Sequence, residues 1–340
     1  MGRITLAHGA GGRESEELIK RLFKFVKLRK VPNGTGLDEF DDGAFIPLSK
    51  HIVFTIDSYT VDPIFFPGGD IGKLAAAGSI NDVCVMGAEP IAALDSIVVE
   101  EGFPLDQLNK IIKSMITTFE NENVAILGGD LKVMPKGKID KIVITTAVIG
   151  YLNDSKELLL DSKIRPGDKL IVSGTIGEHG AVITAFRMGI EAEFEGLKSD
   201  CEPVTKVMRT AKEIGGIHAA KDPTRGGLAM ALNEFAQKSN ITLYIDEERI
   251  PIREEVNAFC EMLGIDPLFL ACEGRVLIAV DSERADELLS ALRKAGYDKA
   301  EIIGEARRVK GREGFVILRT RAGGLRIVEK PTGELTPRIC

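Results

Sequence analysis

The order of hydrophobic and polar positions predicts strands and helices that alternate along most of the chain. Short apolar runs bounded by turn residues are typical of buried strands, and longer segments with apolar residues three or four positions apart are typical of amphipathic helices. The pattern predicts strands at 52–58, 91–99, 123–127 and 139–149, and helices at 71–80 and 105–120. We expect these elements to form a first domain, residues 1–155.

A second series of strands and helices follows after about residue 160. The predicted strands are 168–173, 241–245, 275–280 and 299–304, and the predicted helices are 178–189, 203–214, 227–239, 252–263 and 282–295. They define a second domain, residues 156–310. Residues 311–340 contain two short predicted strands, near 314–319 and 325–329, and then a segment with two prolines and no periodicity, which predicts a mobile tail.

Composition supports an α/β protein of two domains. The chain has 340 residues, 44% of them hydrophobic, with 36 glycines and few aromatic residues, which suits a fold with many tight turns. The net charge of −7 argues against a nucleic-acid-binding surface. No apolar run is long enough for a membrane span and the N-terminus lacks the apolar core of a signal peptide, so we expect a cytoplasmic protein.

The cysteines point to one special position. Their number, five, is odd, and no C-x-x-C pair occurs, which argues against a disulfide framework and against a structural zinc site. Four of them have apolar or helical surroundings, and most of these four are expected to be inert core residues. Cys340 is the last residue, and ten extended residues reach about 30 Å. A swinging arm could therefore carry this thiol into an active site; the alternative is an incidental cysteine on a disordered end.

Glycine-rich stretches predict contacts with phosphate. The stretch His8-Gly9-Ala10-Gly11-Gly12 precedes a predicted helix, and backbone N–H groups of such a stretch can turn toward an anion. It matches neither of the common phosphate-binding motifs. His8 could assist there; the alternative is a turn histidine.

Aspartates recur at loops or strand ends close to small residues. They are Asp42, Asp57, Asp82, Asp130 and Asp222, with Gly128-Gly129 before Asp130 and Gly226 after Asp222. Magnesium prefers oxygen ligands and commonly shares them with substrate phosphates. Together the aspartates predict metal-bridged triphosphate binding, although each one alone could be a turn or N-cap residue.

The motifs carry a family resemblance. Asn81-Asp-Val-Cys-Val-Met-Gly-Ala-Glu-Pro90, Gly128-Gly-Asp130 and Asp222-Pro-Thr-Arg-Gly-Gly227 resemble those of the ATP-using superfamily that includes aminoimidazole ribonucleotide synthetase, selenophosphate synthetase and thiamine-monophosphate kinase. The opening glycine stretch and the ending Pro337-Arg-Ile-Cys340 resemble the HypE family of hydrogenase maturation proteins. The resemblance implies a two-domain PurM-like fold of the α/β (α+β) class, and a homodimer built on the N-terminal mixed sheet.

The resemblance also implies a reaction. A HypF-type carbamoyltransferase would carbamoylate Cys340, and ATP would then drive dehydration of the thiocarboxamide to a thiocyanate. The cyano group would pass to iron on a HypC–HypD complex and become a ligand of the [NiFe] hydrogenase site. The alternatives are a small-molecule ATP enzyme of the same superfamily and a nucleotide-binding scaffold without turnover.

Roles can be assigned to the motif residues within that hypothesis. Asp42, Asp82, Asp130 and Asp222 are the expected ligands of Mg²⁺ or phosphate-side carboxylates, and Asp57 and Asn81 the residues that line ATP. Glu273, in a short polar segment before a strand, is the candidate proton acceptor, with a surface carboxylate as the alternative. Lys132 could offset phosphate charge, with a solvated loop lysine as the alternative.

Overall fold

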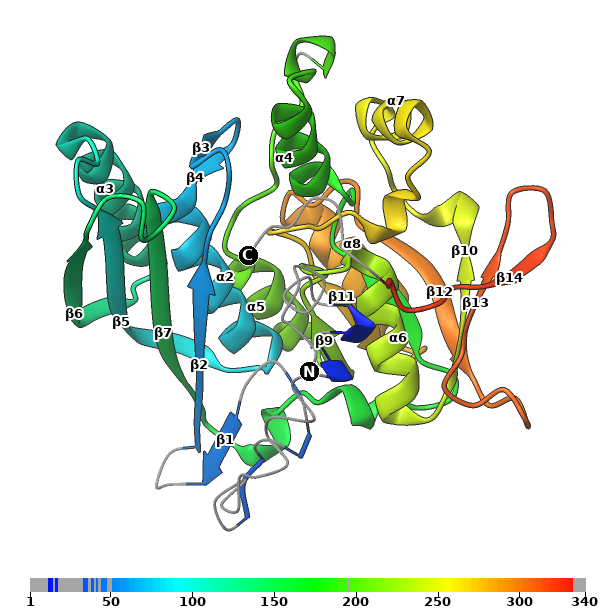
Figure 1. The fold of residues 1–340 in the computed structure, drawn as a ribbon. Helices are drawn as coiled ribbons and strands as arrows, with labels where there is room; N and C mark the ends of the chain where they lie inside the picture. The colour runs from blue at the N-terminus through cyan, green and yellow to red at the C-terminus, as the bar shows by residue number, and fades with distance from the viewer. Residues whose placement is uncertain are drawn as a thin grey trace.

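The computed structural model describes residues 51–194 and 196–332, together with residues 12–14, 16–17, 33–35, 38–39, 41 and 44–47. Two sheets organise the fold, one in each half of the chain (Figure 1). The two-domain α/β architecture expected from the sequence is therefore confirmed. The boundaries at residues 155 and 310 stay predictions.

The N-terminal sheet has five strands in the order β1-β2-β7-β5-β6. Its strands are β1 (Ala44–Pro47), β2 (His51–Tyr59), β5 (Glu89–Glu100), β6 (Ala125–Met134) and β7 (Ile142–Leu152). Strands β5 and β6 are parallel and the other neighbours are antiparallel, so the sheet is mixed. A two-stranded hairpin, β3 (Phe65–Phe66) and β4 (Gly69–Asp70), leads into the first long helix.

Helix α2 (Ile71–Val85) is the central element of the molecule, and lies between the N-terminal sheet and helix α5 (Thr205–Ile214) of the second domain (Figure 1). Asp70 caps it, since its Oδ1 accepts hydrogen bonds from the N–H groups of Gly72 and Lys73 at 2.8 and 3.0 Å. A Cβ atom at Gly72 would lie 2.1 Å from the carbonyl oxygen of Ile111 in helix α3 (Leu105–Asn121). Small residues thus let the two helices approach closely.

The opposite face of the N-terminal sheet is apolar and exposed. Phe54, Ile56 and Leu94 point to it with 40, 66 and 47% of their surface accessible. Alternate residues of the same strands, such as Val53 and Ala93, are buried toward the helices. We call this surface the open face.

The C-terminal sheet has seven strands in the order β14-β13-β10-β12-β8-β11-β9. They are β8 (Lys169–Val172), β9 (Ile217–Lys221), β10 (Thr242–Asp246), β11 (Leu277–Val280), β12 (Glu301–Arg307), β13 (Val316–Arg319) and β14 (Leu325–Ile327). Its helices are α4 (Glu178–Met188), α5, α6 (Gly227–Ser239), α7 (Glu254–Leu263) and α8 (Ala285–Lys294). Strands β13 and β14, which we had placed beyond residue 310, pair within this sheet.

Two differences from the predicted elements bear on function. The strand predicted at 123–127 was too short: β6 continues to Met134, so Gly128-Gly129-Asp130 lies inside an edge strand and not at a strand end. Position 129 favours glycine, because a Cβ atom there would lie 2.6 Å from the Asp95 carboxylate on β5. Strand β9, which leads directly to Asp222, was not predicted.

Candidate active site

Four carboxyl groups gather in one pocket between the two domains. We define the acidic pocket by Asp57, Asp82, Asp222 and Glu273, which line it together with Ser58, Tyr59, Gly78, Thr224 and Arg225. The first domain supplies its residues from β2 and α2, and the second from the segment after β9 and the segment before β11. The structure therefore brings together three of the predicted aspartates and the candidate proton acceptor.

The first domain fixes its two aspartates through neighbouring elements. The hydroxyl of Thr55 on β2 donates a hydrogen bond of 2.8 Å to Asp82 Oδ2 near the end of α2. Asp57 lies two residues further along β2, and so on the same face of the sheet as Thr55. Asp222 enters from the other domain at the end of β9, where the chain turns into helix α6.

Glu273 is a buried carboxyl group. The residue is only 2% exposed, and its Oε1 has no hydrogen-bond partner among the described residues. Burial raises the pKa of Glu273 well above its usual range, and the negative charges of Asp200 and Asp222 raise it further, while Arg225 opposes them. A carboxyl group with a raised pKa in a cleft is suited to proton transfer.

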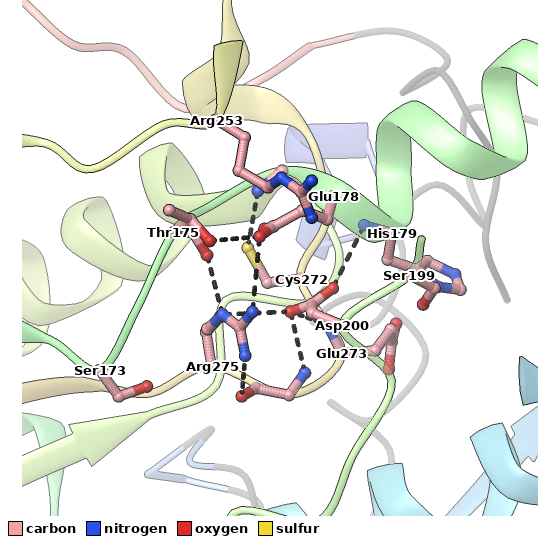
Figure 2. A network of polar contacts seen from close by, with 12 residues as sticks. Ser173, Thr175, Glu178, His179, Ser199, Asp200, Arg253, Cys272, Glu273 and Arg275 are labelled. Carbon is pink, nitrogen blue, oxygen red and sulfur yellow. Dashed lines mark hydrogen bonds and ion pairs between the residues drawn. The ribbon is translucent and has the colours of Figure 1, made fainter. Parts of the chain in front are cut away.

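Asp200 holds the backbone that carries Glu273 (Figure 2). The N–H groups of Glu273 and Gly274 both donate to Asp200 Oδ2 at 3.1 Å, and the N–H of His179 donates to Asp200 Oδ1 at 3.2 Å. Arg275 Nε lies 3.9 Å from Asp200 Oδ2 and donates to the carbonyl of Thr175 at 2.8 Å. This network keeps the Glu273 segment rigid against helix α4.

The sequence analysis missed Asp200 and Arg275. Asp200 and Arg275 interact with each other although they lie far apart in the chain, so no local sequence pattern revealed the pair. One signal was present: a charged residue, Arg275, stands immediately before the buried run of β11. Such a charge needs a partner when its surroundings are apolar.

Asn81 joins the two domains. Its Nδ2 donates to the carbonyl oxygens of Glu202 and Glu273 at 3.2 and 3.1 Å, and its Oδ1 accepts from the N–H of Val204 at 2.8 Å. The residue is fully buried. We had expected Asn81 to line the nucleotide; the structure shows its amide bonded across the domain interface, and the nucleotide role stays a prediction.

Replacing Asn81 with alanine is expected to lower the free energy of unfolding by about 2–4 kcal/mol, because three backbone groups, two of them in buried hydrogen bonds, lose their partner. Urea denaturation followed by circular dichroism measures this. The matched control is Asn109→Ala on the exposed side of α3, where a change within about 0.5 kcal/mol is expected. Equal midpoints for the two variants would refute the interdomain role.

Asp130 and Lys132 lie away from the acidic pocket within one chain. Asp130 is in register with Ser96 of β5, which is in register with Thr145 of β7. The hydroxyl of Thr145 lies 2.7 Å from that of Ser58, and all of these positions alternate with the helix-facing ones, so Asp130 points to the open face. Strands β5 and β7 separate Asp130 from β2, which carries Asp57.

Several predicted site residues lie outside the described residues: His8, Gly9, Gly11, Asp42 and Cys340. Within the described part of the chain, no three His, Cys, Asp or Glu side chains are grouped closely enough to hold a metal ion. The magnesium site of four aspartates therefore stays a prediction. Gly12 and Gly226 are described, and both contact Pro331.

The other four cysteines are core residues, as expected for most of them. Cys84, Cys201, Cys260 and Cys272 are buried and free. Burial raises the pKa of the first two and of Cys272 well above the usual range, and that of Cys260 to about 12. A buried thiol with a raised pKa reacts poorly.

Comparisons with known proteins agree with this geometry. Residues 40–152 match the N-terminal domain of AIR synthase related proteins, and residues 165–317 match the C-terminal domain. The chain is 48% identical to a putative hydrogenase expression/formation protein of Methanocaldococcus jannaschii, over 99% of this chain and 100% of the relative. It is 40% identical to carbamoyl dehydratase HypE of Cupriavidus necator, over 100% of this chain and 95% of the relative. The chain belongs to the HypE family.

A solved structure extends the likeness of this HypE-family chain to three dimensions. A crystal structure of HypE in complex with ATP has 37% identity and a TM-score of 0.82, and covers 99% of this chain and 100% of that one. The resemblance to the HypE family is thereby confirmed.

Proposed function

We propose that this chain is an ATP-dependent carbamoyl dehydratase that acts on its own C-terminal cysteine and supplies the cyanide ligand for [NiFe] hydrogenase maturation. Curated members of its family carry the name carbamoyl dehydratase, and a related HypE binds ATP. The observation that carries the proposal is the acidic pocket between the two domains, which the buried Glu273 lines together with Asp82 and Asp222.

The reaction on a carbamoylated Cys340 can be written so that it balances. The carbamoyl oxygen attacks the γ-phosphorus of ATP and ADP leaves, which turns a poor leaving group into phosphate. One N–H proton is lost in this step. Loss of the second N–H proton with expulsion of phosphate leaves S–C≡N, so the oxygen removed from the carbamoyl group departs in the phosphate. The protein must supply charge stabilisation and a proton acceptor.

Glu273 is the proposed proton acceptor. It must be ionised to accept a proton, and its raised pKa makes the carboxylate a stronger base once formed. The guanidinium of Arg225 in the same pocket opposes the pKa rise and so favours the ionised form. Because Glu273 is buried, water is kept from competing at the reacting carbon.

Magnesium fits the donor set of the acidic pocket. Asp82, Asp222 and Asp57 offer only hard oxygen atoms, which Mg²⁺ prefers. We propose that Asp82 and Asp222 hold the ion, with Asp42 as a further ligand. When bound, Mg²⁺ would neutralise charge on the triphosphate.

The proposed reaction at Cys340 requires a partner that donates the carbamoyl group and a partner that accepts the cyano group. A HypE–HypF complex has been solved for a relative with 37% identity and a TM-score of 0.84, over 94% of this chain and 100% of that one. We propose that a HypF-type carbamoyltransferase loads Cys340 and that a HypC–HypD complex accepts the cyano group, in the cytoplasm. Of the helices that the structure describes, none has the length and apolar character needed to cross a membrane.

A homodimer would cover the open face. Phe54, Ile56 and Leu94 expose apolar surface there, and a second copy of the sheet presents the same surface. Asp130 points to this face at strand β6, and we place Lys132, two residues further, beside it. A partner protomer would then bring both residues toward a site that they do not reach within their own chain.

Mass spectrometry of the C-terminal peptide tests the proposed function. After incubation with a carbamoyl donor system, Cys340 is expected to gain one carbamoyl group, and addition of Mg-ATP is expected to remove the mass of one water from that peptide. The Cys340→Ser variant is the control and should show neither change. An unmodified Cys340 beside a donor of proven activity would overturn the proposal.

A further inference from the structure

The start of the C-terminal tail is held against the N-terminal glycine stretch. Pro331 is buried, and its carbonyl oxygen accepts a hydrogen bond of 3.3 Å from the N–H of Arg13. A Cβ atom at Gly12 would lie only 2.7 Å from that same oxygen. Position 12 therefore has a packing requirement for glycine that is separate from any contact with phosphate.

A second motif glycine contacts Pro331 from the other side. Gly226 has φ = +80°, and a Cβ atom there would lie 3.0 Å from Pro331 Cγ. Gly226 directly follows Arg225, which lines the acidic pocket. Pro331 thus lies close to both Gly12 and the motif that supplies Asp222.

The residues before Pro331 are also fixed. Lys330 Nζ lies 2.7 Å from Glu16 Oε2, and these side chains are only 13 and 26% exposed. The carbonyl of Val328 accepts a hydrogen bond of 3.0 Å from Asn233 Nδ2 on α6, and its N–H donates to the carbonyl of Val316 at 2.9 Å. Val328, Lys330 and Pro331 are consequently all held by hydrogen bonds or ion pairs to other parts of the chain.

We propose that these contacts form a tail clamp, which fixes the origin of the arm and so positions Cys340 for the acidic pocket. The tail clamp consists of Gly12, Arg13, Glu16, Gly226, Lys330 and Pro331. Nine residues from Pro331 to Cys340 span at most about 30 Å. A short tether with a fixed origin raises the effective concentration of its end at a nearby site. The role of the clamp rests on the proposed function, because it acts on the delivery of Cys340.

The clamp also gives the glycine stretch a second role. Arg13 and Gly12 close the stretch that we predict to bind phosphate, and both touch the first residue of the tail. A nucleotide that binds at Gly12 and Arg13 would stabilise the clamp, and the arm would then favour positions near the pocket. Loosening the clamp should uncouple the position of Cys340 from the binding of ATP.

Cys340 can be followed selectively by thiol labelling. The other four cysteines are buried, so a thiol-reactive disulfide reagent reports on Cys340 in the full-length folded chain. Mg-ATP is expected to slow labelling of the wild-type chain. In Lys330→Glu a like charge faces Glu16, and the protection by Mg-ATP is expected to fall about fivefold, with the affinity for ATP by calorimetry falling by no more than the same factor.

Charge exchange supplies the specificity control. The double variant Glu16→Lys/Lys330→Glu restores opposite charges and is expected to regain the protection, whereas a merely destabilised chain would not. Glu329→Lys changes an exposed neighbouring residue and should behave as wild type. Wild-type protection in Lys330→Glu, or no recovery in the double variant, would overturn the clamp.

The same labelling separates the clamp from the proposed function. A wild-type chain that dehydrates carbamoylated Cys340 but shows no effect of Mg-ATP on labelling would refute the clamp and leave the dehydratase standing. Protection that depends on Lys330 in a chain without dehydration would refute the proposed function and leave the clamp.

Discussion

The Glu273→Gln variant is expected to dehydrate carbamoylated Cys340 about 10²–10⁴-fold more slowly than the wild type, which is the usual contribution of a positioned general base. Glutamine keeps the shape of the side chain and its buried position, so ATP should still bind with near wild-type affinity. Single-turnover measurement of the thiocyanate peptide gives the rate, and calorimetry gives the affinity.

A control variant makes this result specific to Glu273. Glu202→Gln changes an exposed side chain close to the same domain interface and should leave the rate unchanged. An equally slow reaction in that control, or a wild-type rate in Glu273→Gln, would exclude Glu273 as the proton acceptor.

The pH dependence of stability gives a second signature of Glu273. Its pKa is raised in the folded state, so the unfolded state loses the proton first as pH rises. Folding stability from this group is therefore present below the usual glutamate range and is lost as pH rises toward the folded pKa. The Gln variant lacks this loss, and denaturant titrations should show it gaining stability relative to wild type as the pH rises above the usual glutamate range.

Glu273 and its surroundings show how much of the fold and of the site could be predicted from the sequence. Local periodicity predicted most helices and strands, because each depends on residues a few positions apart. It placed Asp57, Asp82 and Asp222 at suitable ends of elements, and these do line one pocket with Glu273. The residue that holds Glu273 in place, Asp200, follows no such pattern, because it meets its partners only after the second domain has folded.

Glycine and asparagine were the harder residues to interpret. Gly128-Gly129 was taken as the end of a strand, whereas the edge strand β6 continues through it and Gly129 makes room for Asp95. Asn81, which the motif resemblance predicts to line ATP, forms hydrogen bonds across the domain interface. In each case the requirement comes from a neighbour that is remote in the chain, so residue type alone could not reveal it.

Asp130 leads to the second large expected effect. The Asp82→Asn and Asp130→Asn variants are each expected to lose most dehydratase activity, since each removes a proposed ligand for Mg²⁺ or phosphate. Their positions differ, however: Asp82 lines the acidic pocket, and Asp130 points to the open face beyond two intervening strands. If the open face is the dimer interface, each site combines Asp82 of one protomer with Asp130 of the other.

Mixing the two inactive variants should therefore restore activity. In a mixed dimer one site carries both substitutions and the other carries neither, so tandem-tagged mixed dimers should show about half of the wild-type rate, and random mixtures about a quarter. Both chains retain Cys340, so the supply of the arm is the same in every dimer. A site built within one chain would leave each site of the mixed dimer with one substitution, and no activity would return. The recovered rate thus measures whether the partner completes the site, without any assumption about which carboxylate touches the metal.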